Sequence, residues 1–176
     1  MTYRFKGTVK KLTSIANEAK TNPTLKTHLD NFSEYWLEGF SPLVGRDVPS
    51  KKPRPPDGHR HVHLHPGYFS SDEACKKIRW DKWSTTHYDS CEDAQDIPYK
   101  EHPTSDTLLF YLVDENRTAY VFHYLADGAH AFLESANYGE LVNTSIKLIE
   151  SSGECIMGWE SHHELFELKW INDNND

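Results

Sequence analysis

The stretch TLLFYLVDENRTAYVFHYL, Thr107–Leu125, decides the fold. Two apolar runs, 107–113 and 118–125, flank the short polar turn DENR, and this pattern predicts an antiparallel hairpin. Both runs are apolar at successive positions, so both faces of each strand have to be covered. The hairpin is therefore predicted to lie at the centre of a sheet.

Two helices are predicted, one on each side of the hairpin in the sequence. The first follows Asn22, a good N-cap, with Pro23 at the first helical position and Gly39 placed to end it. Its apolar residues recur at spacings of three or four: Leu25, Leu29, Phe32, Trp36 and Phe40. The second is predicted over about 138–152, with Gly153 as its stop. The alternating stretch 2–12 predicts an opening strand.

Three further segments complete the predicted organisation. Residues 41–60 hold five prolines and two glycines, which predicts a loop. Residues 66–105 lack a clean period and are expected to be an insertion with one short helix near 71–80. The acidic end is expected to form a hairpin that completes the sheet. The prediction is an α+β domain over 1–153, with an N-terminal strand and helix packed on a central antiparallel sheet, an insertion at 66–105, and an extension at 154–176.

Composition and charge narrow the environment and the partners. The chain has 176 residues and a net charge of -8, which disfavours general attraction to nucleic acid. Residues 45–65 nevertheless carry five Lys or Arg against two Asp, whereas 150–176 carry seven acids and one lysine. No apolar run is long enough to span a membrane, and the first residues lack the apolar core of a signal peptide. A cytoplasmic location is therefore expected.

The segment HRHVHLH, 59–65, places four histidines on one face of a predicted strand. The row would span about 20 Å, so one metal ion cannot bind all four. Two neighbours are close enough for one ion if other residues complete its shell. The available donors are His123, His130, Asp127 and Glu134. None of these residues has a recognised metal-ligand spacing.

Acid/base chemistry is the second interpretation of this strand. Imidazole both takes and gives a proton near neutral pH. Two imidazoles on one face are able to bracket a phosphate, one removing the proton of a ribose 2′-OH and the other protonating the 5′-oxygen. A guanidinium from Arg46 or Arg60 would stabilise the added charge. The plain structural alternative is a strand whose histidines only fill its solvent face.

Several short motifs, in order, resemble the YafO family of mRNA-interferase toxins. They are GRD at 45–47, HVHL at 61–64, the hairpin, and a histidine shortly before a helix. The resemblance covers about 3–65 and 106–152. It implies a RelE-like fold and an endoribonuclease that cleaves mRNA, in that family on the ribosome. The implied catalytic residues are His63, His61 and His130, with Asp127 as a possible partner of His130.

The resemblance also implies partners and a phosphate-binding set. A cognate antitoxin protein and mRNA are the expected partners, and neither a metal nor another cofactor is expected. Five basic residues are candidates for binding RNA phosphates: Arg46, Arg60, Lys51, Lys52 and Arg54. The chain departs from the family in its insertion, its acidic extension and its negative charge.

Two other functions stay open at this stage. One is a metal-dependent enzyme that uses the His-x-His strand motif, and the other is a non-catalytic protein whose acidic surface binds a partner. The insertion interleaves basic residues with Trp80 and Trp83. This pattern suits either stacking on single-stranded RNA or a small packed subdomain.

Overall fold

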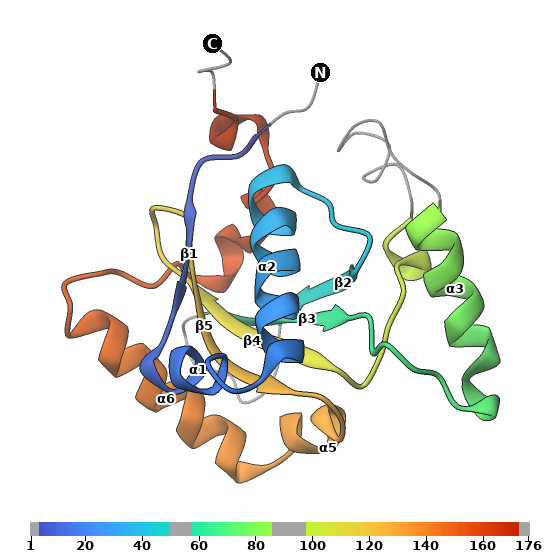
Figure 1. The fold of residues 1–176 in the computed structure, drawn as a ribbon. Helices are drawn as coiled ribbons and strands as arrows, with labels where there is room; N and C mark the ends of the chain where they lie inside the picture. The colour runs from blue at the N-terminus through green and yellow to red at the C-terminus, as the bar shows by residue number, and fades with distance from the viewer. Residues whose placement is uncertain (1–3, 50–57, 86–97, 173–176) are drawn as a thin grey trace.

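The computed structural model describes residues 4–49, 58–85 and 98–172. It is an α+β fold around one five-stranded sheet in the order β1-β5-β4-β3-β2 (Figure 1). The strands are β1 (Thr8–Lys11), β2 (Val44–Pro49), β3 (His59–Leu64), β4 (Leu108–Val113) and β5 (Thr118–Leu125). Only β1 and β5 pair in parallel; the other neighbours are antiparallel. The sheet is open and mostly antiparallel, as predicted.

The hairpin of β4 and β5 occupies the middle of the sheet, and its prediction is confirmed. Every residue of β4 is buried. The turn is held by Asp114, whose Oδ1 accepts hydrogen bonds from the backbone N–H groups of Asn116 and Thr118. Arg117 adopts a left-handed conformation at φ 60°. A polar turn between two apolar runs is thus enough to set this pair of strands.

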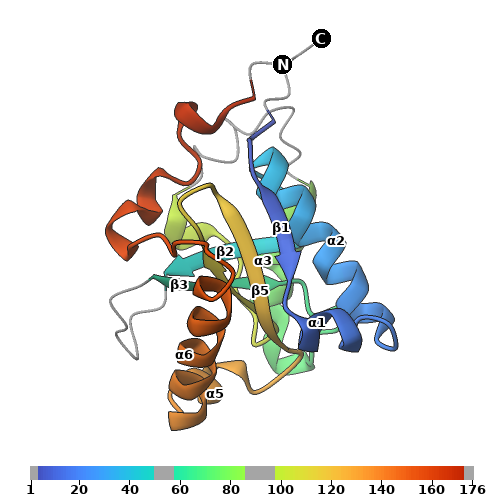
Figure 2. The ribbon, with the colours of Figure 1, turned by 90° about the vertical axis from the view of Figure 1, so that its left-hand side faces the viewer.

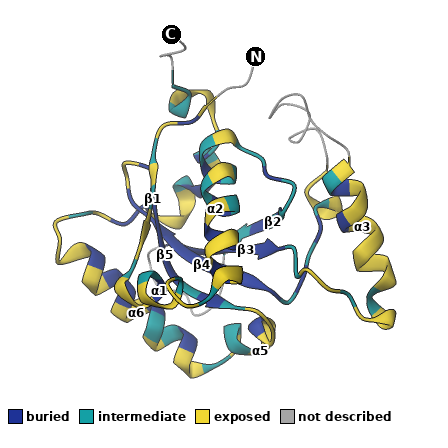
Figure 3. Cartoon of the chain, in the orientation of Figure 1, coloured by how far each residue is buried: buried dark blue, intermediate teal, exposed yellow. Residues whose placement is uncertain are grey.

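Helices cover both faces of the sheet (Figure 2). On one face lies α2 (Pro23–Glu38), which begins after Asn22 and ends at Gly39 in the left-handed conformation, as predicted. The shorter α1 (Thr13–Glu18) adds Ile15 to the same core. On the other face lie α5 (Ala129–Leu133) and α6 (Ala136–Glu150). Each face therefore buries its own hydrophobic cluster, while the outer sides of α2 and α6 are exposed (Figure 3).

The proline-rich stretch 41–60 was predicted to be a loop, and that prediction is wrong for its first part, since residues 44–49 form β2, the edge strand. At its other end, 59–60 begin β3, where the histidine strand was predicted. The register between β2 and β3 shifts between Val44 and Asp47, so the edge strand carries a bulge. An edge strand tolerates such irregularity and also the proline at its end, because one side of its backbone needs no partner.

The insertion forms a small packed subdomain. It contains the 3-10 turns η1 (Ser71–Glu73) and η2 (Tyr99–Glu101) and helix α3 (Ala74–Thr85), longer than predicted. Trp80 and Trp83 are buried, and their indole N–H groups donate to the carbonyl oxygens of Thr104 and Val44. These two rings anchor α3 to the sheet edge, so they do not form an exposed platform for RNA bases.

The C-terminal extension does not form the predicted hairpin. It contains the 3-10 helices η3 (Trp159–Glu164) and η4 (Leu168–Trp170), with single bridges from Ile156 to Asp114 and from Ile171 to Phe5. Buried Arg117 holds the segment in place by donating to the carbonyl oxygens of Leu165 and Trp36. Of the alternating residues Phe166, Leu168 and Trp170, only Phe166 lies against the Arg117 guanidinium, and Leu168 is exposed. In the described part of the chain, no helix has the length and apolar character that crossing a bilayer requires.

Candidate functional site

The histidines of β3 alternate faces with their neighbours, as the sequence predicts. His59, His61 and His63 lie opposite Leu112, Phe110 and Leu108 of β4, on the face that α6 covers. Val62 and Leu64 point to the other face and join the α2 core. His65 lies beyond the end of the strand, with its ring 5.1 Å from that of Trp80. Three histidines, not four, therefore share the strand face.

The three strand histidines differ in their surroundings. The Nδ1 atom of His59 is 2.6 Å from the hydroxyl oxygen of Tyr138, which ties β3 to α6. The ring centroids of His61 and His63 are 5.5 Å apart. His61 and His63 are buried, at 7% and 3% exposed. His59 is thus a structural contact, and the inner two form the start of an imidazole cluster.

Burial keeps His61 and His63 neutral. Desolvation, with added repulsion from His63 and His130, lowers the pKa of His61 to about 3. Desolvation also lowers the pKa of His63 to about 4, with further lowering by His130 and Arg46, whereas the hydrogen bond that His63 donates to the carbonyl oxygen of Ser105 raises it. At neutral pH each ring therefore carries one proton, on one of its two nitrogens.

The backbone of Ser105 provides a partner for either tautomer of His63. The Nδ1 atom of His63 lies 2.8 Å from the carbonyl oxygen of Ser105 and 3.0 Å from its amide nitrogen. A protonated Nδ1 donates to the carbonyl, and an unprotonated Nδ1 accepts from the amide. Nε2 of His63 is the proton acceptor in the first case and the proton donor in the second. This arrangement suits a group that moves a proton.

His130 completes the cluster from the start of α5. Its ring centroid is 5.5 Å from that of His63, so residues 67 positions apart in sequence meet at one end of the sheet. The side chain of His130 is 57% exposed, in contrast to the buried rings on β3. The row His61–His63–His130 therefore joins two buried rings to one that reaches solvent.

Asp106 orients His130. Its Oδ1 atom is 2.6 Å from Nδ1 of His130 and also accepts from the amide of His130 at 2.9 Å, while Oδ2 accepts from Gly128. Burial of Asp106 opposes its charge, yet these hydrogen bonds from His130 and Gly128 hold its pKa below the ordinary value. A carboxylate accepts only, so Nδ1 of His130 carries the proton and Nε2 is the nitrogen directed away from Asp106. This is the carboxylate–histidine arrangement that general acid/base sites use.

The predicted carboxylate partner, Asp127, does not have this role. The interaction found for its side chain is with the amide of Gly128, the next residue. The sequence did hold a signal for Asp106: it precedes the first strand of the predicted hairpin, and His130 follows the second. Because the two strands are antiparallel, the start of one and the end of the other lie at the same end of the sheet.

Arg60 lies on the opposite face of β3 from the histidine row, so its predicted place beside the histidines is wrong. Its Nε atom is 3.1 Å from Oδ1 of Asp47 and 3.0 Å from the hydroxyl oxygen of Tyr111. Burial opposes the charge of Arg60, but the Asp47 carboxylate holds its pKa above the ordinary value. This buried ion pair belongs to the α2 side of the sheet.

The other predicted phosphate-binding residues have different fates. Arg46 lies on the edge strand, where its Nη2 donates to the carbonyl oxygen of Lys100 at 2.8 Å and its guanidinium lies over the ring of Tyr99. Its charge is close enough to lower the pKa of His63. Lys51, Lys52 and Arg54 lie outside the described residues.

The described side chains do not build a metal site. Across residues 4–49, 58–85 and 98–172, no three His, Cys, Asp or Glu side chains converge as a metal shell would require.

Searches against protein-family models, curated proteins and solved structures returned no match to this chain.

Proposed function

We propose that this protein is an endoribonuclease that cleaves mRNA by histidine acid/base catalysis, as the toxin of a type II toxin–antitoxin pair. The observation that carries the proposal is the meeting of His63 and His130, with the Asp106 carboxylate on the outer ring. The toxin role, the cognate antitoxin and the action on ribosome-bound mRNA come from the resemblance of the sequence to the YafO family, and the cytoplasmic location stays the expectation drawn from the sequence composition.

The two rings suit opposite steps of RNA cleavage. Neutral His63, in the tautomer whose Nδ1 donates to Ser105, accepts the proton of a ribose 2′-OH at Nε2. The 2′-oxygen then attacks the adjacent phosphorus, and the bond to the 5′-oxygen breaks. His130, protonated and held by Asp106, gives its Nε2 proton to that oxygen. The products are a 2′,3′-cyclic phosphate and a free 5′-hydroxyl.

The difference in exposure between the two rings supports one direction of substrate entry. His63 is 3% exposed, whereas His130 reaches solvent. RNA is therefore expected to approach from the His130 end of the row, and His63 has to become more exposed to reach it. Arg46, the cation whose charge acts on His63, is our candidate for binding the phosphate. His61 is auxiliary, because its pKa is lower than that of His63 and its ring is farther along the strand from His130.

The test is cleavage of a defined mRNA by protein purified without a histidine tag. His63→Gln and His130→Gln should each lower the cleavage rate by about 10²–10⁴-fold. Thr24→Gln is the control, since Thr24 is exposed in the first turn of α2, lines no part of the pocket described below, and both side chains are uncharged. The mRNA is assayed with and without translating ribosomes, and the 5′ ends are mapped.

Two results would contradict the proposal. One is equal cleavage, or equal absence of growth arrest on expression, for the wild type and His63→Gln. The other is stoichiometric zinc or iron in the purified protein together with loss of cleavage in EDTA. That second result would favour the metal-dependent use of His61 and His63 instead.

A further inference from the structure

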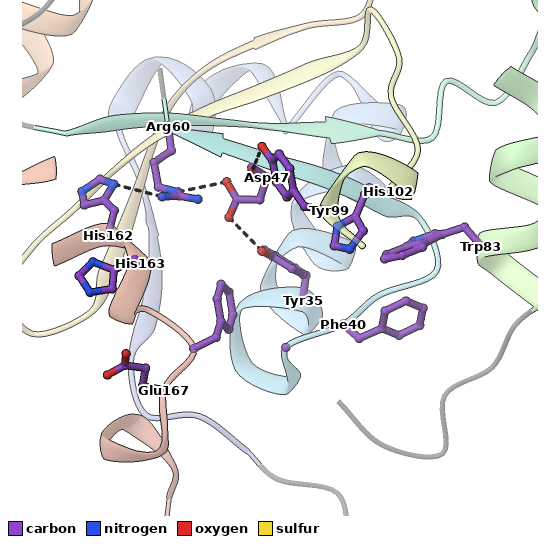
Figure 4. A pocket seen from close by; sticks show the side chains of 13 residues that line it. Tyr35, Phe40, Asp47, Arg60, Trp83, Tyr99, His102, His162, His163 and Glu167 are labelled. Atoms are coloured by element: carbon purple, nitrogen blue, oxygen red, sulfur yellow. Dashed lines mark hydrogen bonds and ion pairs between the residues drawn. The ribbon is translucent and has the colours of Figure 1, made fainter. Parts of the chain in front are cut away.

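A pocket of about 430 Å³ lies on the α2 side of the sheet, away from the histidine row (Figure 4). Three parts of the chain build it. The core supplies Arg60 and Asp47, the insertion supplies Trp83 and Tyr99, and the C-terminal extension supplies His162 and Phe166. The insertion and the extension are the two segments that set this chain apart from the YafO-like pattern, and here they meet around one ion pair.

Buried polar groups form the floor of the pocket. Oδ2 of Asp47 accepts hydrogen bonds from the hydroxyl groups of Tyr35 at 2.9 Å and Tyr111 at 2.6 Å. Nη1 of Arg60 is 3.3 Å from Nδ1 of His162, and Figure 4 shows the guanidinium between His162 and Asp47. Since a guanidinium only donates, Nδ1 of His162 accepts and its ring proton is on Nε2.

One donor and one acceptor remain available side by side on this floor. Among the described residues, no partner is found for Nη2 of Arg60, a side chain that is 9% exposed. Oδ1 of Asp47 accepts from Nε of Arg60 and keeps a second lone-pair direction. The floor thus presents an N–H donor next to a carboxylate oxygen.

Flat rings line the side of the pocket that the insertion builds. The rings of Phe40 and Trp83 are 5.2 Å apart, and His102 lies 4.8 Å from Trp83. Tyr99 is half-exposed at the rim, with its hydroxyl group donating to the backbone oxygen of Asp47 at 3.1 Å. Aromatic walls of this kind stack on planar heteroaromatic rings.

We propose that this pocket binds a nucleobase whose edge has a carbonyl next to an N–H, the edge that uracil, guanine and hypoxanthine share. Arg60 donates to the base carbonyl and Asp47 accepts from the base N–H, while Tyr99 stacks on the ring. The volume is in the range of pockets for small ligands. Bases with the opposite edge, cytosine and adenine, place a donor against Arg60.

The charges of the pocket select the base over the phosphate. Arg60 and Asp47 cancel, and Glu167 adds a negative charge to the lining. Burial, with repulsion from Arg60, lowers the pKa of His162 to about 4, so this ring is neutral at pH 7. These groups together therefore carry no net positive charge that would attract an anion. It recognises hydrogen-bonding pattern and shape.

Titration calorimetry of the full chain with four nucleosides tests the proposal. Uridine and inosine should bind, and cytidine and adenosine should bind at least about tenfold more weakly, because the donor and acceptor are exchanged on otherwise similar rings. Tyr99→Ala should weaken uridine binding about tenfold by removing the stacking ring. Tyr68→Ala is the matched control, since Tyr68 is 79% exposed and does not line the pocket.

Three results would overturn the proposal. The first is equal affinity for uridine and cytidine, and the second is an equal effect of the two tyrosine substitutions on uridine binding. The third is no saturable binding up to about 10 mM uridine. His63→Gln should leave uridine binding unchanged. A protein that binds uridine but does not cleave RNA would refute the proposed nuclease and leave the base pocket standing, and the reverse result would do the opposite.

Discussion

The two faces of strand β3 bury polar side chains by different physical means. On the α6 face, His61 lies beside Phe110, and both His61 and His63 remain neutral. On the α2 face, Arg60 remains charged and is matched by Asp47, with two tyrosine hydroxyl groups on the same carboxylate. Adjacent residues of one strand thus enter opposite electrostatic environments.

The difference follows from the side chains themselves. An imidazole that is buried gives up its proton at modest cost, whereas a guanidinium cannot be deprotonated in a protein and must carry a counter-ion with it. Burial and the nearby Asp47 carboxylate raise the pKa of Tyr35 and Tyr111, so both keep the proton that they donate to Asp47. The histidines on the α6 face are therefore neutral, whereas the groups on the α2 face keep their charges and protons.

Removing the Asp47 carboxylate should destabilise the protein, and this is the largest effect that we expect. We expect Asp47→Ala to lower the free energy of unfolding by about 3–5 kcal/mol, because it leaves Arg60 buried without a counter-ion. Urea denaturation at pH 7 measures this loss. The double variant Asp47→Leu with Arg60→Met should recover most of it, since it removes both charges together. A loss below about 1 kcal/mol in the single variant would show that solvent reaches Arg60.

Acid should destabilise the folded protein through His61. The pKa of His61 is about 3 in the folded protein and about 6.5 when exposed, so the unfolded chain takes up this proton first as pH falls. Stability is thus full above about pH 6.5 and declines toward pH 3. We expect His61→Gln to lose about 3 kcal/mol less than the wild type between pH 7 and pH 4. Urea denaturation at both pH values provides the comparison.

The control for this second prediction is His163→Gln, because that ring is exposed. Its loss of stability between the two pH values should equal that of the wild type. If His61→Gln and His163→Gln behave alike, His61 is open to water and its low pKa is not a property of the folded protein.

The smallest expected effect concerns the outer end of the histidine row. Asp106→Asn should lower the rate of RNA cleavage by about 10–100-fold, because the side chain loses the charge that stabilises a charged ring. The one oxygen of the Asn side chain still accepts from the amide of His130, and the amide of Gly128 keeps its hydrogen bond to Asp127. Urea denaturation should show little change. Comparable loss of folding stability and activity would instead mean that Asp106 only caps α5.

Local patterns in the sequence were sufficient for part of this molecule. The hairpin of β4 and β5, the start of α2 after Asn22 and its end at Gly39, and the α6 helix each rest on neighbours within one element. The alternation of His59, His61 and His63 is equally local, since it follows from the period of a strand. The resemblance implied catalytic roles for His61, His63 and His130, and the fold shows that the rings of His63 and His130 meet.

Tertiary structure decided the rest, because long-range pairing and burial are not encoded in a local period. β2 is a strand only because β3 offers it an edge, and the extension packs on Arg117 although its alternation suits a strand. The same is true of function. The sequence shows Arg60 as one more cation near the histidines, and only the fold turns it to the opposite face, where Asp47 neutralises it and two distant segments enclose it in a pocket.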